Sequence, residues 1–342
     1  MTKILVTGGS GFIAAHIVEQ LLAAGHTVVT TVRSEDKAAR LREAHASDRL
    51  SVAIVGDIAV EGAFDDVVAK TPGIEVVMHT ASPFHFRWTD AQTELIDPAL
   101  VGTTSILRAV HRLAPSVRRV VVTSSFAAVL TEALLGDPGT TFDESSWNPS
   151  TIADVHSSPA TAYRVSKTLA ERAAWDFVAR ERPAFDLATV CPPMVYGPLA
   201  PGGGVASLDA VNTSNERFVA MCRGAWAAGG APDTGLVTIW VDVRDVARAH
   251  VLAMEKPDAG GRRLFPVGGR FSNRRLVDIV RERFPEYADR LPGPDVPGGG
   301  APPADKNFKY NNDETVRVLG IQWTSLEDSV EGVVRSLKTY GL

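Results

Sequence analysis

The sequence has little cysteine and no arrangement of residues typical of a metal site. Its two cysteines, Cys191 and Cys222, have neither C-x-x-C nor any other metal-ligand spacing, which favours two buried, reduced thiols and suits the cytoplasm. The eight histidines include no H-E-x-x-H pattern, so we expect no bound metal.

Long basic and long apolar runs are also missing. The net charge is −5 and no stripe of Lys or Arg is present, so nucleic acid is not an expected partner. No run approaches the roughly 20 apolar residues that span a bilayer. The first residues, MTKILVTGG, enter a strand pattern without the regions of a signal peptide. We expect a cytoplasmic protein, monomer or homodimer, that does not bind membranes.

What is present is an ordinary globular composition with an alternation of strand and helix patterns. Hydrophobic residues make up 45% of the 342 residues and charged residues 22%. Short apolar runs lie at 3–7, 27–32, 50–55, 74–82, 117–125 and 185–190. Because such continuous runs are typical of parallel strands covered on both faces, the sequence predicts an α/β fold with a doubly wound parallel Rossmann sheet.

A glycine-rich turn, TGGSGFIA, joins the first predicted strand to the first predicted helix. Glycines allow the backbone to turn sharply and to approach a pyrophosphate, and the N-terminus of the following helix offers free N–H groups. Gly-rich turns are common, but this one lies between a strand and a helix, as a dinucleotide site requires. We therefore expect a bound dinucleotide.

The end of the second strand indicates which dinucleotide is bound. An acid here would hold the ribose hydroxyls of NAD, but the sequence has Arg33, with Lys37 one helical turn further on. The two cations are either solvated surface charges or ligands of a 2′-phosphate, and the missing acid favours NADPH. Asp57, after the third strand, either accepts a hydrogen bond from the adenine amino group or caps a loop.

The composition changes after residue 190, with Pro and Gly at 197–204 and helical material around 218–226. A strand and a helix follow over 237–254, and the Pro- and Gly-rich stretch 291–305 is expected to be a loop. We predict an NADP-binding Rossmann domain of residues 1–190 plus about 236–262. A smaller, mainly C-terminal substrate lobe would then consist of about 191–235 plus 263–342.

The stretch YRVSK carries two reactive side chains on a predicted helix that begins near Ser158 and Pro159. Tyr163 and Lys167 are four residues apart, so a phenol and an ammonium project side by side. A neighbouring cation and an oxidised nicotinamide both favour the phenolate, which would make Tyr163 a usable general acid. Such a pair also occurs by chance on exposed helices.

A hydroxyl that fixes a substrate carbonyl beside Tyr163 would come from the strand end VVVTSS, because ligands collect at the carboxyl ends of strands in open α/β sheets. We choose Ser125 as this hydrogen-bond donor, with Ser124 as the alternative. Either serine alone could simply end the strand.

With these motifs in order, the sequence resembles the extended short-chain dehydrogenase/reductase family over essentially its whole length. TGGSGFIA, VVVTSS, YRVSK, CPPMVYGP and VDVRDVA match in sequence and order. ASPF, GTTSIL, FDESSWNP and AERAAW look most like the dihydroflavonol-reductase branch, and the likeness is closest to yeast-type NADPH-dependent methylglyoxal, aldehyde and ketone reductases. Two departures are Ala99, where many members have Asn, and Ala14, which replaces the usual third glycine.

The resemblance implies a catalytic triad of Ser125, Tyr163 and Lys167. It also implies contacts to NADP(H) at Gly8, Gly9, Ser10, Gly11, Phe12, Ile13, Arg33, Lys37, Asp57, Ile58, Ala81, Tyr163, Lys167, Pro192, Val195 and Ser214. The implied activity is NADPH-dependent reduction of a ketone or aldehyde to an alcohol, with Tyr163 as proton donor and reverse oxidation possible.

Four apolar residues just beyond the strand ends, Phe84, Phe126, Leu130 and Met194, either wall a pocket for an apolar or aromatic carbonyl or belong to the core. Arg87 and Trp88 would edge its mouth. Two other functions remain open: a sugar-nucleotide epimerase or dehydratase, and a non-catalytic NADP-sensing regulator. The first usually retains NAD tightly, which Arg33 disfavours; the second generally lacks the Tyr-Lys pair.

Overall fold

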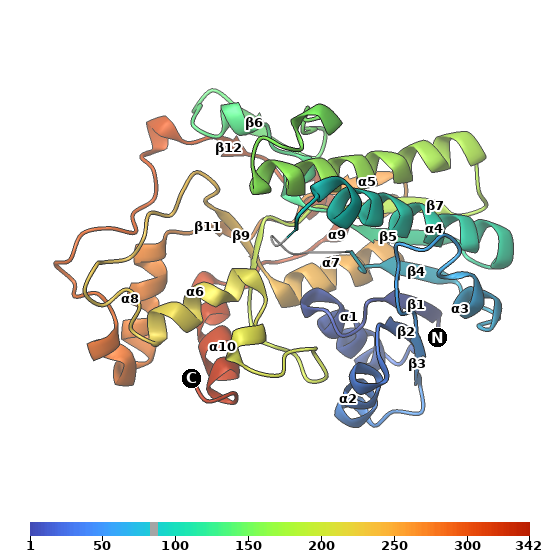
Figure 1. Cartoon of the computed structure of the whole chain (residues 1–342), viewed down its shortest axis with the longest axis horizontal. Coiled ribbons are helices and arrows are strands. Elements are labelled where there is room, and N and C mark those ends of the chain that lie inside the picture. The colour runs from blue at the N-terminus through green and yellow to red at the C-terminus, as the bar shows by residue number, and fades with distance from the viewer. Residues whose placement is uncertain (83–87) are drawn as a thin grey trace.

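A computed structural model describes residues 1–82 and 88–342. Its centre is a seven-stranded parallel sheet in the order β10-β7-β5-β4-β1-β2-β3 (Figure 1). The strands are β1 (Lys3–Thr7), β2 (Thr27–Val32), β3 (Leu50–Ile54), β4 (Val76–His79), β5 (Arg119–Thr123), β7 (Asp186–Val190) and β10 (Arg262–Leu264). The strand order reverses beside β1, so the predicted doubly wound α/β fold is confirmed.

Helices cover both faces of this sheet (Figure 1). One layer contains α1 (Phe12–Ala23) and α7 (Val243–Glu255), and the other contains α3 (Asp65–Ala69), α4 (Asp97–Leu113) and α5 (Pro159–Glu181). A π-helical turn, Gln92–Ile96, leads into α4, while α2 (Glu35–His45) lies beside the edge strand β3.

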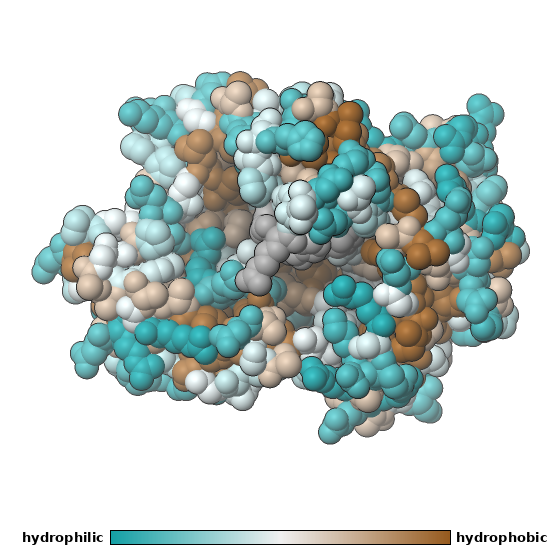
Figure 2. All heavy atoms as spheres, viewed as in Figure 1, coloured by the Kyte–Doolittle hydropathy of each residue, from teal (hydrophilic) through white to brown (hydrophobic). Residues whose placement is uncertain are grey.

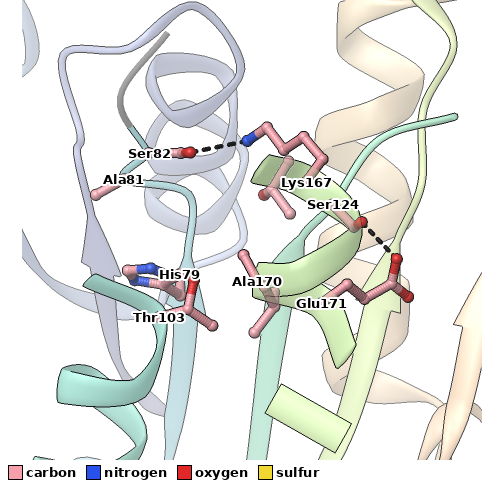
Figure 3. Close-up of a pocket in the computed structure, with 10 residues that line it drawn as sticks. His79, Ala81, Ser82, Thr103, Ser124, Lys167, Ala170 and Glu171 are labelled. Atoms are coloured by element: carbon pink, nitrogen blue, oxygen red, sulfur yellow. Dashed lines mark hydrogen bonds between the residues drawn. The ribbon is translucent and has the colours of Figure 1, made fainter. Parts of the chain in front are cut away.

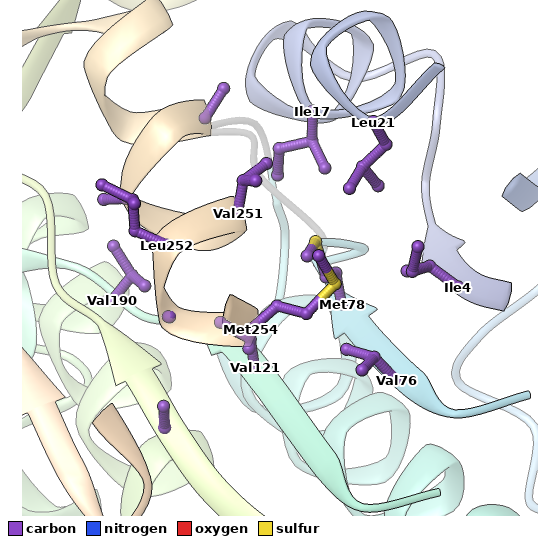
Figure 4. Packing of buried hydrophobic residues seen from close by; sticks show 14 of the residues in the cluster. Ile4, Ile17, Leu21, Val76, Met78, Val121, Val190, Val251, Leu252 and Met254 are labelled. Atoms are coloured by element: carbon purple, nitrogen blue, oxygen red, sulfur yellow. The ribbon is translucent and has the colours of Figure 1, made fainter. Parts of the chain in front are cut away.

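Alternating residues of each strand bury against the two helical layers, as the period of two along a strand requires. In β4, Val76 and Met78 pack towards α1 and α7, while Val77 packs towards α4 and α5. Figure 4 shows Ile17 and Leu21 of α1 lying over these strands. This core fixes the sheet, and thereby the strand ends that carry the candidate site.

A smaller part of the molecule lies beside the carboxyl ends of the strands. It contains the three-stranded sheet of β8 (Met194–Tyr196), β9 (Ile239–Asp242) and β11 (Gly269–Arg270). Its helices are α6 (Thr213–Cys222), α8 (Asn273–Arg283) and α10 (Leu326–Lys338), which share an apolar core. Between the two parts the surface is hollowed, as Figure 2 shows.

The remaining elements are a two-stranded sheet of β6 (Thr141–Phe142) and β12 (Lys309–Tyr310), helix α9 (Asp313–Leu319) and several short 3-10 turns. The strand predicted within 237–254 is β9, which pairs outside the central sheet, and its helix is α7, which packs on that sheet. The exact residue boundaries of the two predicted lobes stay a prediction. In the described residues, no helix is both long and apolar enough to cross a membrane.

Candidate active site

The predicted catalytic side chains lie together at the carboxyl edge of the central sheet. Ser125 follows β5 and begins a short 3-10 turn, while Tyr163 and Lys167 project from α5. The helix begins as predicted, because the Ser158 hydroxyl accepts a hydrogen bond from the N–H of Thr161. Strand and helix thus bring together residues that are far apart in the sequence.

Tyr163 points its phenol at Ser125. The Tyr163 Oη lies 3.4 Å from Ser125 Oγ, and Ser125 Oγ in turn accepts a 3.1 Å hydrogen bond from the N–H of Ala127. Burial raises the pKa of Tyr163 above its usual value, and the hydrogen bond to Ser125 opposes this only in part. The expected shift towards the phenolate is therefore absent in the protein alone, and the phenol stays protonated at neutral pH.

Lys167 is held beside Tyr163 by a residue that sequence analysis missed. Its Nζ donates a 2.8 Å hydrogen bond to Ser82 Oγ, in the segment after β4 (Figure 3). The same Nζ lies 5.9 Å from the centre of the Tyr163 ring. Burial lowers the pKa of Lys167 to about 8. The ammonium form therefore still predominates at pH 7. The sequence feature that could have indicated Ser82 is its position as a polar residue just beyond a predicted parallel strand.

The two adjacent serines have different partners. Ser124 is buried and its hydroxyl donates a 2.6 Å hydrogen bond to Glu171 Oε2, as Figure 3 shows. Ser125 instead faces Tyr163. The geometry therefore selects Ser125 over the alternative Ser124 as the hydroxyl beside the phenol.

Glu171, one turn beyond Lys167, is the centre of a buried polar cluster that the sequence did not reveal. Its carboxylate is 1% exposed and receives hydrogen bonds from Arg263 (2.7 Å), Thr189 (2.7 Å) and Ser124. The Arg263 guanidinium also lies 3.7 Å from the ring centre of Trp147. This cluster joins α5 to β5, β7 and β10 directly behind the candidate site.

The glycine turn has no room for a side chain at Gly9 and has a backbone conformation at Gly8 that disfavours one. A Cβ on Gly9 would lie 2.0 Å from Thr30 Oγ1, and Gly8 has a φ of +75° that favours glycine. Gly11 precedes α1, whose first turn has neither a side-chain cap nor an acidic residue. The exposed N–H groups and the positive end of the helix dipole fit a pyrophosphate.

Arg33 and Lys37 lie at the start of α2, close to one another. Burial, and then the positive charges of Arg33 and Arg40, lower the pKa of Lys37. Within residues 1–82 and 88–342, neither Arg33 nor Lys37 forms an ion pair with an acidic side chain. The two cations are thus available to an anion. Asp57 Oδ1 accepts a 2.8 Å hydrogen bond from the N–H of Ala59, which matches the loop-cap interpretation.

Most of the other predicted coenzyme contacts border the glycine turn. Ala81 lies against Gly8, because a Cβ on that glycine would come within about 3.2 Å of it. Val195 of β8 is in an apolar cluster against which Phe12 and Ile13 pack. The remaining residues are Ser10 in the turn itself, Ile58 packed beside α4, Pro192 whose carbonyl accepts the N–H of Phe126, and Ser214 in the first turn of α6.

The predicted pocket residues are divided between core and surface. Phe126 and Leu130 are 2% and 3% exposed, and the Phe126 ring stacks on Phe265 and Phe308. The structure therefore packs both into an apolar cluster, which corresponds to the core alternative. Met194 of β8 is partly exposed and packs on the core of the smaller part. Phe84 and Arg87 lie outside the described residues, while Trp88 is partly buried beside α4 and α5.

A comparison with family models matches residues 4–268 to the NAD dependent epimerase/dehydratase family. Among curated proteins, the ketoreductase azaE of Aspergillus niger is 42% identical over 338 residues, which cover 98% of this chain and 97% of that protein. The NADPH-dependent methylglyoxal reductase GRE2 of Saccharomyces cerevisiae is 36% identical over 337 residues, or 96% of each chain.

Among solved structures, the complex of Gre2 with NADPH from Candida albicans superposes with a TM-score of 0.90 at 35% sequence identity, and the match covers 100% of both chains. The match includes both parts of the molecule and the whole described site.

Proposed function

The chain belongs to the NAD dependent epimerase/dehydratase family, and from this premise we propose that it reduces a ketone or aldehyde to an alcohol with NADPH. The observation that carries the proposal is the 3.4 Å approach of Tyr163 Oη to Ser125 Oγ, with Lys167 one turn further along the same helix. The names of the ketoreductase and methylglyoxal reductase relatives support the same reaction class.

Each of the three side chains has one role in this proposal. Ser125 donates a hydrogen bond to the carbonyl oxygen of the substrate and so holds it beside Tyr163. Tyr163 donates its phenolic proton to that oxygen as the negative charge develops. Lys167 keeps a positive charge near the phenol, which stabilises the phenolate that remains. The reverse sequence of proton transfers would serve oxidation of an alcohol.

NADPH, when bound, supplies the hydride that reduces the carbonyl carbon. Its pyrophosphate would lie against the turn of Gly8, Gly9 and Gly11 and the N-terminus of α1. Arg33 and Lys37 would bind the 2′-phosphate through charge-assisted hydrogen bonds. Lys167 would donate to the hydroxyls of the nicotinamide ribose. Two observations support these assignments: the turn has no room for a Cβ at Gly9, and within the described part of the chain neither cation pairs with an acidic side chain.

The substrate would enter the hollow between the two parts of the molecule. The proposed Rossmann domain, residues 1–190 plus about 236–262, supplies the catalytic and coenzyme-binding groups. The remaining residues, about 191–235 plus 263–342, form one wall through Met194, the predicted pocket residue that is partly exposed on β8. An apolar or aromatic carbonyl compound suits this wall.

The test is to mix the purified protein with NADPH and a panel of aromatic ketones, aldehydes and β-ketoesters and to follow the absorbance of the reduced nicotinamide. We expect turnover by the wild type and almost none by Tyr163→Phe, with NADPH binding largely intact in the variant. NADPH binding without turnover of any carbonyl would contradict the proposal and favour the regulator.

The same assay separates the epimerase or dehydratase alternative. Such an enzyme recycles its coenzyme within each turnover, so it would convert a sugar nucleotide without net consumption of NADPH. A product that forms without NADPH oxidation would therefore overturn the reductase proposal.

A further inference from the structure

Lys167 lines a small, partly enclosed cavity of about 10 Å³, which is close to the roughly 10–15 Å³ needed by one water molecule. It lies between β4, β5, α4 and α5. The polar side chains that line it are those of His79, Ser82, Thr103, Thr123, Ser124, Lys167 and Glu171, most of which Figure 3 labels. A cavity of this size with so many polar groups is suited to a bound water rather than to an apolar atom.

The proton on the neutral His79 ring can be assigned from the hydrogen bonds of Thr7. Thr7 Oγ1 accepts the N–H groups of Thr80 (3.2 Å) and Ala81 (3.1 Å), which occupy both lone pairs of the hydroxyl oxygen. The hydroxyl must therefore donate its own hydrogen to His79 Nδ1, 2.9 Å away. Burial, and then the charge of Lys167, lower the pKa of His79 to about 3, so the ring is neutral and its single proton is on Nε2.

This Nε2–H is a buried donor whose acceptor remains to be identified. His79 is 2% exposed, and its Nε2 has no hydrogen-bond partner in the part of the chain that the structure describes. An unsatisfied buried donor is strongly disfavoured. Lys167, on the other side of the cavity, also carries only donors. The two residues can be linked only by a group that accepts two hydrogen bonds.

We propose that the cavity binds one structural water, which accepts hydrogen bonds from His79 Nε2 and Lys167 Nζ. Its own hydrogens can be accepted by Thr103 Oγ1 and by Ser124 Oγ, which keeps lone pairs free while donating to Glu171. The ammonium of Lys167 then has a defined partner for each hydrogen: Ser82, the water and, if the proposed function is correct, the nicotinamide ribose.

His79 is therefore a positioning residue for Lys167. Through the water it joins the ammonium to β4, and through Thr7 to β1 beside the glycine turn. Among residues 1–82 and 88–342, the other titratable side chains near Lys167 are Tyr163 and Glu171, both on α5. The facing residues of α4, β5 and the segment after β4 contribute the hydroxyls of Thr103, Thr123, Ser124 and Ser82.

Two measurements on the wild-type protein test the water without any assay of turnover. A high-resolution crystal structure with NADPH should show a water within hydrogen-bond distance of both His79 Nε2 and Lys167 Nζ. Long-range proton–nitrogen NMR correlations should show that His79 is protonated at Nε2 alone. No water at that position, or a proton on Nδ1, would overturn the proposal even if carbonyl reduction were established.

A matched pair of variants tests the effect on Lys167. His79→Phe fills the ring volume, next to the ring of Phe64 at 5.8 Å between centres, but lacks the donor. His79→Gln places an amide N–H near the former Nε2. Both variants lose the Nδ1 acceptor of the Thr7 hydroxyl. A difference between the two variants therefore reports the N–H donor at the Nε2 position alone.

Losing the water should lower the alkaline pKa of kcat/KM for carbonyl reduction by about one unit in His79→Phe. His79→Gln should restore most of that shift. If the alkaline pKa of kcat/KM were the same in the two variants, the positioning role of His79 would be contradicted. If the wild type reduced no carbonyl at all, the proposed function would fail, while the crystal and NMR results would still decide on the water.

Discussion

Ser124 donates a 2.6 Å hydrogen bond to the buried carboxylate of Glu171, which fastens the end of β5 to the helix that carries the candidate proton donor. The next residue, Ser125, then faces Tyr163 at 3.4 Å. Two neighbouring hydroxyls of the same strand end are thus assigned to different tasks, one to packing and the other to the site. Substitutions can separate the two.

Ser125→Ala should lower kcat for carbonyl reduction by about 10²–10³-fold, because it removes a donor aimed at the developing oxyanion. Ser124→Ala should instead mainly lower the free energy of unfolding, by about 1–2 kcal/mol, since it removes a buried hydrogen bond. Steady-state kinetics and urea unfolding of both variants would check this. A larger loss of kcat in Ser124→Ala than in Ser125→Ala would reverse the assignment.

Glu171→Gln should destabilise the protein by about 3–5 kcal/mol, because it leaves the Arg263 guanidinium buried without its anion. Arg263 is 9% exposed at its side chain and pairs with Glu171 at 2.7 Å. Urea unfolding would measure the loss. The double variant Glu171→Met, Arg263→Met serves as control, since replacing both charges removes the unpaired ion. It should be clearly more stable than Glu171→Gln, and equal stabilities would contradict the role of the ion pair.

Arg33→Asp should raise the Michaelis constant for NADPH about 10–100-fold and change that for NADH far less, because it removes a charge-assisted hydrogen bond to the 2′-phosphate. Arg108→Asp is a matched control with the same change in charge. Arg108 lies on α4 and forms an exposed ion pair with Glu61. Equal effects of Arg33→Asp on both coenzymes would remove Arg33 from the phosphate site.

Gly9→Ala should lower stability by about 1–3 kcal/mol and weaken NADPH binding, because the added Cβ would lie 2.0 Å from Thr30 Oγ1. Thr30 cannot move away freely, since its hydroxyl donates a 2.7 Å hydrogen bond to the carbonyl of Val6. Gly136→Ala is the control, as a Cβ there meets nothing within 4 Å. Thermal unfolding and NADPH titration would check this, and equal effects of the two substitutions would contradict it.

The central sheet and the family could be predicted because their signals are local. Parallel strands covered on both faces are apolar runs, and the predicted run 27–32 coincides with β2. TGGSGFIA and YRVSK each lie within a few residues, and the extended short-chain dehydrogenase/reductase resemblance that they carried is confirmed. The individual roles of the site residues stay predictions.

Contacts between distant segments could not be predicted. β10 has only three residues, Arg262–Leu264, of which two are charged, so no apolar run indicates a seventh strand. Arg263 forms its ion pair with Glu171 only because this strand pairs with β7. Phe126 was a candidate pocket residue because its stacking partner Phe265 is far away in the sequence. The two rings meet only once β10 has joined the sheet. A spacing of four residues puts Glu171 on the same face of α5 as Lys167, but it does not indicate that the carboxylate is buried.

The pH dependence of carbonyl reduction should follow Lys167 rather than Tyr163. Burial lowers the pKa of Lys167 to about 8 and raises that of Tyr163, so the ammonium loses its proton first as the pH rises. We expect kcat/KM to be level near neutral pH and to fall as the pH rises through about 8. An unchanged kcat/KM up to the pH at which a phenol titrates would show that the charge of Lys167 is not needed.

Lys167→Met should abolish most activity and yet stabilise the protein without coenzyme. The folded pKa of about 8 lies below the ordinary 10.5, so the unfolded chain binds a proton between these values that the folded chain lacks. The free energy of unfolding of the wild type therefore rises with pH across this window, and below pH 8 the buried charge destabilises it fully. At pH 7 the variant should be more stable by about 1–3 kcal/mol. Urea unfolding of both proteins across this pH range should show the two curves converging towards pH 10.5. A variant less stable than the wild type at pH 7 would mean that the hydrogen bonds of the ammonium in the folded state outweigh its cost of burial.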